Sequence, residues 1–391
     1  MEKFTESHVN YFILTKQHLT PESRISDITQ IAKNIGGIHA TSQTTTYLST
    51  FFRANKFSIE EFEKEIYEKK NLGKIRCMRK SIFIQPKELI PIFYMGTKKQ
   101  YAKRHEDYLN NLGVSLQDYE KSASEIKNIL AGRILSTTEI KKEVTSKEHT
   151  THFISLMCDK LDIIRNKPLK SWRDKRHSYS LFSEYFPDMN FEDISEEESM
   201  KFIVKHYLKS LGPATETDIV WWTGFNKTQT RKILFELEDG LEKIQIEGIE
   251  KEFYILSEDL EKLKQLQKKE ENIVNLLSDL DPYLMGHKDR ERLVKDEHYN
   301  YMFDRSGNAT SCILLNGRVV GIWDFVSSSE TEIKIFLLEE LEDSIKQNVV
   351  DEVNRVGLFI FDEKIKIKEC QNMEPLKSRT PGEMLTPLKH C

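Results

Sequence analysis

The chain has 391 residues, of which 38% are hydrophobic and 31% charged, and its formal net charge is −5. This length exceeds what one small core can organise and predicts two to four domains in a globular protein. No apolar run approaches the roughly 18 residues that a membrane helix needs, and the N-terminus lacks the apolar segment of a secretory signal. We therefore expect a cytoplasmic protein that has no membrane partner.

The cysteines indicate the same compartment. They are scattered along the chain and form no CxxC pair, a pattern that predicts neither a disulfide framework nor a zinc site. No phosphate loop or dinucleotide-binding glycine fingerprint occurs either. The five cysteines are Cys77, Cys158, Cys312, Cys370 and Cys391.

Charge is distributed unevenly along the chain. Residues 69–176 hold 24 Lys and Arg but only 12 Asp and Glu, so this basic sector carries +12 and the remainder carries −17. Aromatic residues and polar turns interleave with the basic residues. A basic face on an otherwise acidic protein is typical of a polyanion-binding surface, and the alternative is chance segregation of charge in a protein from a lysine-rich proteome.

In chain order, the first segment, to about Gln100, is predicted to form three helices followed by a strand pair. The helices fit residues Ile25–Ile35, Thr44–Arg53 and Ile59–Lys70, and the strand pair lies within Ile75–Ile84. Three helices and a hairpin are typical of a winged helix, whose wing here would be basic.

Between the first two helices, Gly36 and Gly37 are followed by two polar side chains, His39 and Thr41. Residues i and i+2 of an extended segment project to the same side, so an imidazole and a hydroxyl can converge on one water molecule. The alternative is an ordinary start of a helix, in which His39 is a partly buried histidine with its hydrogen bonds satisfied.

A second unit follows, with helices over Ser115–Ala131, Glu139–Thr145 and His149–Leu161 and a strand that begins at Ile163. The turn after that strand again reads as a basic wing. Its charged and aromatic residues are Lys170, Trp172, Arg173, Lys175, Arg176, His177 and Tyr179.

The pattern repeats a third time and is followed by a β-rich segment. The third unit has a helix over Ser199–Leu211, a second helix capped by Thr215 that runs to Trp222, and a third that begins at Asn226 or Thr228 and runs to Leu237. A hairpin formed by Leu241–Ile246 and Glu252–Leu256 follows. The β-rich segment has strands over Tyr301–Phe303, Ser311–Leu315, Val319–Phe325, Glu332–Leu337 and Lys364–Lys368, a hairpin turn at Asn316-Gly317 and a helix over Leu338–Asn354. We expect the tail after Pro375 to be loose.

The order of elements predicts an α+β protein with three tandem winged-helix units and a small β-rich C-terminal domain. The expected boundaries are 1–112 for the first unit, 113–190 for the second, 191–268 for the third and 269–391 for the C-terminal domain and tail.

Several stretches together resemble the AlkZ/YcaQ-type winged-helix DNA glycosylases over about residues 20 to 365. Three later motifs are specific as a set, and the N-terminal residues follow the order of that family. The later motifs are Leu211–Thr215 with Asp218 and Trp222–Gly224, Leu280–Arg290 and Asn316–Trp323, and the earlier ones are Gly37–Thr41, Arg53 and Met78–Phe83.

The resemblance implies a C-shaped clamp on double-stranded DNA and hydrolysis of the N-glycosidic bond of alkylated bases or interstrand crosslinks. It implies a bacterial, nucleoid-associated enzyme that uses no metal, no organic cofactor and no small-molecule partner, and we expect a monomer. The family's catalytic motif is usually Gln-x-Gln or Gln-x-Asp, and His39 and Thr41 occupy those two positions.

Hydrolysis of this bond passes through a transition state resembling an oxocarbenium ion. A neutral His39 can accept a proton from water or position it, whereas Thr41 can only hold the water through its hydroxyl. Protonated His39 would repel the developing cation, so a neutral imidazole is required and activity is expected to fall below its pKa. Arg53 and Asp281 are the expected supporting residues, and alternatives for Arg53 are a surface or phosphate-binding role.

The remaining site candidates divide by role. The expected DNA contacts are Arg76, Arg79, Lys80, Trp172, Arg173, Lys175 and Arg176. Asp289, Arg290, Trp222 and Trp323 are expected to be structural, with Asp281, Asp289 and Arg290 forming a buried ion network. No metal is expected, because His149 and His152 have no third ligand nearby.

Two other functions fit the same sequence. The scaffold can serve a non-catalytic DNA-binding protein, such as a regulator or lesion binder, and winged helices sometimes bind proteins instead. The basic sector argues against the second of these.

Overall fold

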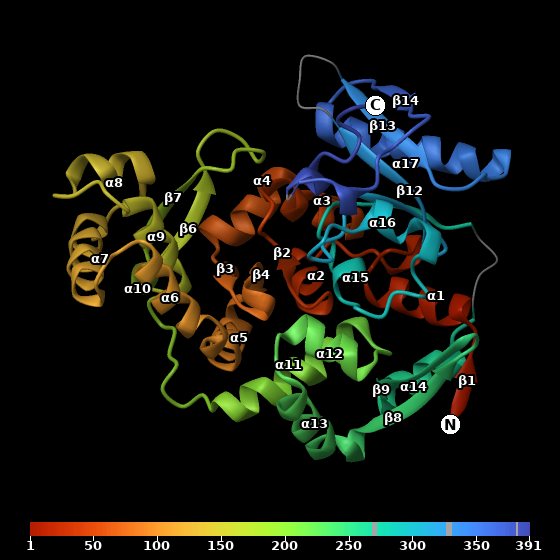
Figure 1. The fold of residues 1–391 in the computed structure, drawn as a ribbon, viewed down its shortest axis with the longest axis horizontal. Coiled ribbons are helices and arrows are strands. Elements are labelled where there is room, and N and C mark those ends of the chain that lie inside the picture. The colour runs from red at the N-terminus through yellow and green to blue at the C-terminus, as the bar shows by residue number, and fades with distance from the viewer. Residues whose placement is uncertain (268–271, 326–330, 381) are drawn as a thin grey trace.

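The computed structural model describes residues 1–267, 272–325, 331–380 and 382–391. The described chain is a mixture of helices and strands in four sheets, three of them three-stranded and one five-stranded (Figure 1). None of its described helices combines the length and apolar character that crossing a bilayer requires.

The first sheet has the order β2-β4-β3, and all its pairings are antiparallel. The helix expected over Ile25–Ile35 begins instead after Asp27, whose carboxylate accepts a hydrogen bond from the Gln30 backbone N–H. The elements are α2 Ile28–Asn34, β2 Ile38–His39, α3 Gln43–Arg53, α4 Ile59–Glu63 with its continuation η2 Lys64–Glu68, β3 Leu72–Arg76, the tight turn η3 Met78–Lys80 and β4 Ile82–Pro86.

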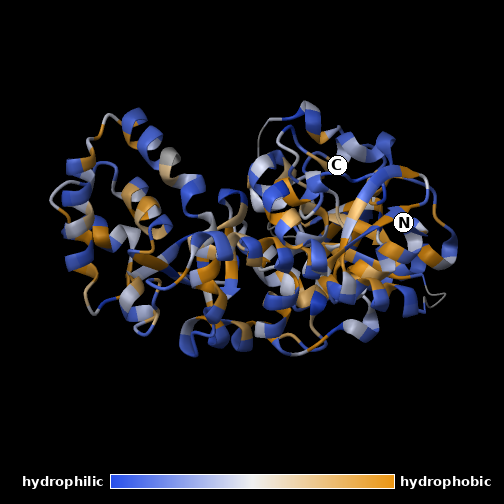
Figure 2. Cartoon of the chain, turned by 90° about the horizontal axis from the view of Figure 1, so that it is seen from below, coloured by the Kyte–Doolittle hydropathy of each residue, from blue (hydrophilic) through white to orange (hydrophobic). Residues whose placement is uncertain are grey.

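The second sheet has the order β5-β7-β6 and its own hydrophobic cluster. Together with its helices it forms the smaller part of the molecule seen in Figure 2, and both chain ends lie in the larger part. The elements, after the connecting helices α5 Ile90–Thr97 and α6 Lys99–Asn111, are α7 Leu116–Leu130, β5 Leu135–Ser136, α8 Thr137–Glu143, α9 Thr150–Asp159, β6 Ile163–Pro168, β7 His177–Leu181 and α10 Phe182–Tyr185.

The third sheet combines segments from distant parts of the sequence. Strand β1 (Glu2–Phe4) runs parallel to β8 (Leu241–Ile246), with Glu2 opposite Ile244, and β9 (Ile249–Leu256) pairs on the other side. No local pattern predicted this pairing. The helices of this region are α1 Glu6–Lys16, α11 Glu196–Leu211, α12 Glu216–Thr223, α13 Lys227–Glu236 and α14 Ser257–Gln265.

The C-terminal sheet has the order β10-β11-β12-β13-β14. The predicted hairpin turn is confirmed, because Asn316 and Gly317 both adopt positive φ, 50° and 84°. The expected strand at Tyr301–Phe303 is wrong, since Tyr301 lies in a short helix, and the expected helix Leu338–Asn354 lies further along. The elements are β10 Val274–Leu277, α15 Pro282–Met285, α16 Tyr299–Met302, β11 Cys312–Leu315, β12 Arg318–Phe325, β13 Glu332–Leu337, α17 Asp343–Phe361 and β14 Lys366–Glu369.

The expectation of a loose tail without disulfides is wrong. Cys370, after β14, is bonded to Cys391, 21 residues later. Three widely spaced apolar residues of the tail, Leu376, Met384 and Leu388, are buried against the C-terminal core. No short sequence motif indicates the disulfide or the burial of the tail, because their contacts join residues that are too far apart in sequence for periodicity to show them.

Candidate active site

The turn into β2 requires glycine. Gly37 has a φ of 102°, and a Cβ at this position would lie 2.3 Å from Nε2 of Gln85, which donates to the carbonyl of Gly36 at 3.2 Å. The glycine pair therefore ends α2 and sets His39 against β4.

His39 is buried on β2, where it is paired with Phe83, and only 5% of it is exposed. Its ring meets the Phe83 ring edge-on at 5.1 Å, and its buried Nδ1 has no hydrogen-bond partner within the described part of the chain. Burial, and next the positive charge of Arg79, lower the His39 pKa to about 3, while Asp281 acts in the opposite direction. The imidazole is therefore neutral at pH 7.

Thr41 lies beyond the end of β2 and is exposed. Its Oγ1 accepts a hydrogen bond from the Ile82 backbone N–H at 3.3 Å. His39 and Thr41 thus contact neighbouring residues of β4, but only the imidazole is buried.

Three residues that the sequence analysis missed, Thr45, Ser278 and Asp279, lie around the start of α3. Thr45 Oγ1 donates to Asp279 Oδ1 at 2.9 Å, while Asp279 Oδ2 and Ser278 Oγ are buried without a partner among the described residues. Burial raises the Asp279 pKa to about 6, despite hydrogen bonds from Thr45 and Ser42. The signal was available, because Asp279 directly precedes the Leu280–Arg290 motif and stands two residues before Asp281.

We call His39, Ser278 and Asp279 the polar cluster. Folded proteins satisfy nearly all buried polar groups. His39 and Asp279 both contact the first turns of α3, through Thr46 and Thr45, and the unpartnered atoms of the three side chains are free to bond to water or a substrate.

Arg53 and Asp281 form a two-pronged ion pair in which both side chains are fully buried. The distances are 2.7 Å from Nη2 to Oδ1 and 2.8 Å from Nη1 to Oδ2. Asp281 also caps α15 by accepting from the Tyr283 N–H. Burial excludes surface and phosphate-binding roles for Arg53, which instead joins α3 to the segment that leads into the C-terminal domain.

The turn between β3 and β4 packs against α12. The guanidinium of Arg79 lies 3.6 Å from the centroid of Trp221, and Arg79 has a φ of 53°. Arg76 donates through Nε to Asp159 of α9 at 2.5 Å, so this side chain joins two units of the protein. Lys80 is exposed.

The turn between β6 and β7 reaches α17. Trp172 packs against Tyr47 and Phe359, and Arg173 donates to the Ile360 carbonyl and lies over the Trp172 ring. Lys175 and Arg176 are exposed, and Arg176 pairs with Asp174 at 2.7 Å.

The predicted ion network among Asp281, Asp289 and Arg290 is wrong in its pairings. Asp289 contacts Lys251 at 2.9 Å and Thr215 at 2.6 Å, and Arg290 donates to the carbonyls of His287 and Gly307. Asp281 instead pairs with Arg53 and Asp289 with Lys251, so each carboxylate binds a cation from another element. Trp222 and Trp323 are both buried, and the Trp323 indole donates to the Leu277 carbonyl at 2.8 Å.

Within the described ranges, no three His, Cys, Asp or Glu side chains are grouped so that they could hold a metal ion. The polar cluster offers one imidazole, one hydroxyl and one carboxylate. It can orient a water molecule, and its carboxylate can face a developing positive charge.

A family model described as "DNA glycosylase AlkZ-like" matches residues 32–359. The interstrand DNA cross-link repair glycosylase of Streptomyces sahachiroi is 23% identical over 334 residues, which cover 80% of this chain and 86% of that protein. The solved structure of Streptomyces sahachiroi DNA glycosylase AlkZ matches with a TM-score of 0.74 and 19% identity, over 94% of this chain and 100% of that one.

These matches define the class of protein: it is a DNA glycosylase, a hydrolase of the bond between base and sugar in DNA. The chain belongs to the AlkZ-like DNA glycosylase family, and the expected family and its α+β fold are confirmed.

Proposed function

We propose that this glycosylase removes alkylated or crosslinked bases from double-stranded DNA and that the polar cluster is its reaction centre. The observation that carries the proposal is the buried, neutral His39, with an unpartnered Nδ1, beside the Asp281 segment that also supplies Asp279. The relative from Streptomyces sahachiroi is named for repair of interstrand crosslinks.

The chemistry divides between the side chains of His39 and Asp279. An alkylated purine is already cationic and leaves without much help, so the enzyme must stabilise the sugar cation and deliver water. His39, with a pKa of about 3, is a weak base and holds the water in place. Asp279, with a pKa of about 6, is ionised at pH 7, where it faces the cation and accepts the proton of the attacking water.

The same proposal includes the scaffold. The three helix-and-sheet units, 1–112, 113–190 and 191–268, are winged helices that form a C-shaped clamp with the C-terminal domain, 269–391. β1 and α1 lie in the first range but complete the sheet and core of the third unit. Thr41, Arg79 and Lys80 flank the reaction centre, and Trp172, Arg173, Lys175 and Arg176 belong to a second contact with duplex DNA. The enzyme works as a monomer without a metal or cofactor, on chromosomal DNA in a bacterial cytoplasm.

The test is formation of abasic sites in methylated and mustard-treated duplexes by the full-length protein and by His39→Ala. The wild type is expected to release damaged bases, and the variant to bind the same duplex with little product. Salt-sensitive binding without abasic product by the wild type would instead select a non-catalytic lesion binder.

A further inference from the structure

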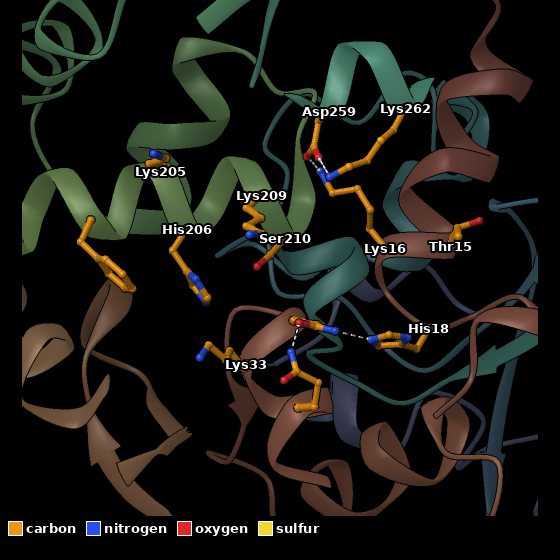
Figure 3. Close-up of a pocket in the computed structure, with 13 residues that line it drawn as sticks. Thr15, Lys16, His18, Lys33, Lys205, His206, Lys209, Ser210, Asp259 and Lys262 are labelled. Atoms are coloured by element: carbon orange, nitrogen blue, oxygen red, sulfur yellow. Dashed lines mark hydrogen bonds and ion pairs between the residues drawn. The ribbon is translucent and has the colours of Figure 1, made fainter. Parts of the chain in front are cut away.

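A cavity of about 510 Å³ lies outside the candidate active site, between α11 and the N-terminal helices α1 and α2 (Figure 3). This volume is in the range of small-molecule sites in proteins. The lining residues are Thr15, Lys16, His18, Gln30, Lys33, Asn34, Phe202, Lys205, His206, Lys209, Ser210, Asp259 and Lys262.

The lining is strongly cationic. Five lysines face one carboxylate, Asp259, which both Lys16 and Lys262 already contact, at 2.7 and 3.0 Å. Lys205 has no ion-pair partner within the described ranges. Lys33 and Lys209 have only long contacts to Glu88 and Glu258, at 3.5 and 4.0 Å. Three ammonium groups are therefore available to an anion.

Two buried polar atoms point to a ligand. His206 and Ser210 extend from α11 toward α2, and Lys33 extends from α2 toward them (Figure 3). His206 is 9% exposed and Ser210 is 1% exposed. Ser210 Oγ and His206 Nε2 have no hydrogen-bond partner of good geometry in the part of the chain that the structure describes, although the Lys33 backbone also acts on the His206 ring as a hydrogen-bond partner. Leaving such groups unpaired in the interior is unfavourable, and a polar ligand that bonds to them would remove this cost.

The cavity also has an aromatic wall. The rings of Phe202 and His206 are stacked, with centroids 5.5 Å apart and planes 12° apart. Both side chains line the cavity. A flat aromatic group can pack on such a pair while phosphate oxygens contact the lysines.

We propose that this cavity binds a small phosphorylated ligand with an aromatic ring, of the nucleotide class. The site is separate from the polar cluster, since none of its lining residues belongs to that cluster. The turn before His39 forms part of the wall between them, because a Cβ on Gly36 would lie 3.7 Å from the Ser210 Cβ. The inference does not depend on the lesion that the enzyme removes.

The test is isothermal titration of the full-length protein with adenosine diphosphate, pyrophosphate and adenosine. We expect the diphosphate to bind more tightly than either fragment. Lys205→Glu/Lys209→Glu, which reverses two exposed charges one helical turn apart, should weaken binding at least about tenfold. The matched control is Lys346→Glu/Lys366→Glu, which makes the same charge change on exposed lysines of the C-terminal domain and should leave binding unchanged.

Three outcomes would overturn the proposal. The first is no binding of the diphosphate or pyrophosphate by the wild type, and the second is equal binding by the reversed and wild-type proteins. The third is displacement of the diphosphate by a short undamaged duplex, together with a loss of duplex affinity in Lys205→Glu/Lys209→Glu that equals its loss of diphosphate affinity. That result would make the cavity part of the DNA path.

Discussion

Arg53 and Asp281 meet as a fully buried, two-pronged ion pair although 228 residues separate them in sequence. The pair fixes the end of α3 to the start of α15, while Thr45 and Asp279 fix the beginning of α3 to the same segment. The polar cluster therefore depends on contact between the first and last parts of the chain.

Removing one partner of this pair should destabilise the whole fold. Arg53→Met leaves a buried carboxylate without its cation, which typically costs about 3–5 kcal/mol of unfolding free energy. Urea unfolding followed by circular dichroism measures the change. Lys64→Met removes an exposed ion pair with Glu60 and should have no measurable effect. A similar midpoint for both variants would contradict this account of the pair.

His39→Ala should lower the rate of base release about 10²- to 10⁴-fold, since the water loses its positioning group. Binding of an undamaged duplex should stay near the wild-type value. Thr41→Ser keeps the hydroxyl that accepts from Ile82 and should retain most of the activity. Single-turnover kinetics on a methylated duplex measure both rates, and full activity in His39→Ala would remove the imidazole from the mechanism.

The pH profile should assign the titrating group. Asp279, with a pKa of about 6, becomes protonated as pH falls through that value, so activity should decline from pH 7 to pH 5. His39, with a pKa of about 3, stays neutral over this window and contributes nothing to the decline. The residual activity of His39→Gln should therefore show the same acid limb. Loss of the limb in this variant would assign it to His39 instead.

Neighbouring basic residues of the β3–β4 hairpin should behave differently. Lys80 is exposed, and its ammonium is expected to contact a phosphate, so Lys80→Ala should reduce the dependence of duplex affinity on salt by about one unit of log–log slope. Arg76→Ala instead breaks a contact with Asp159 between two units and should lower stability. Fluorescence anisotropy at several salt concentrations and thermal unfolding separate the two effects.

Reduction of the Cys370–Cys391 bond should release the tail. A loop of this size contributes about 3 kcal/mol through chain entropy. Cys391→Ser should therefore open the segment after Cys370 to limited proteolysis and leave the earlier units intact. Leu388 would lose its hydrogen bond to Asp324 at the same time. Unchanged cleavage in this variant would show that burial of the tail residues is sufficient.

Sequence patterns predicted most helices, the hairpin turn at Asn316-Gly317 and the position of His39, because these depend on local periodicity and on glycine. They missed β1, the disulfide and the tail, each of which depends on a partner far along the chain. The site was predicted only in part, because one of its residues also depends on a partner far along the chain. The motif identified Asp281, but only packing against Thr45 shows that Asp279 is buried with a free oxygen.

The parallel pairing of β1 with β8 has a consequence for synthesis. Glu2 leaves the ribosome about 240 residues before Ile244, its partner in the sheet. At roughly 5–20 residues per second, β1 remains without that partner for a time on the order of ten to fifty seconds. The third sheet is therefore completed late in translation, and a chaperone that binds the nascent N-terminal segment would have time to act before β8 arrives.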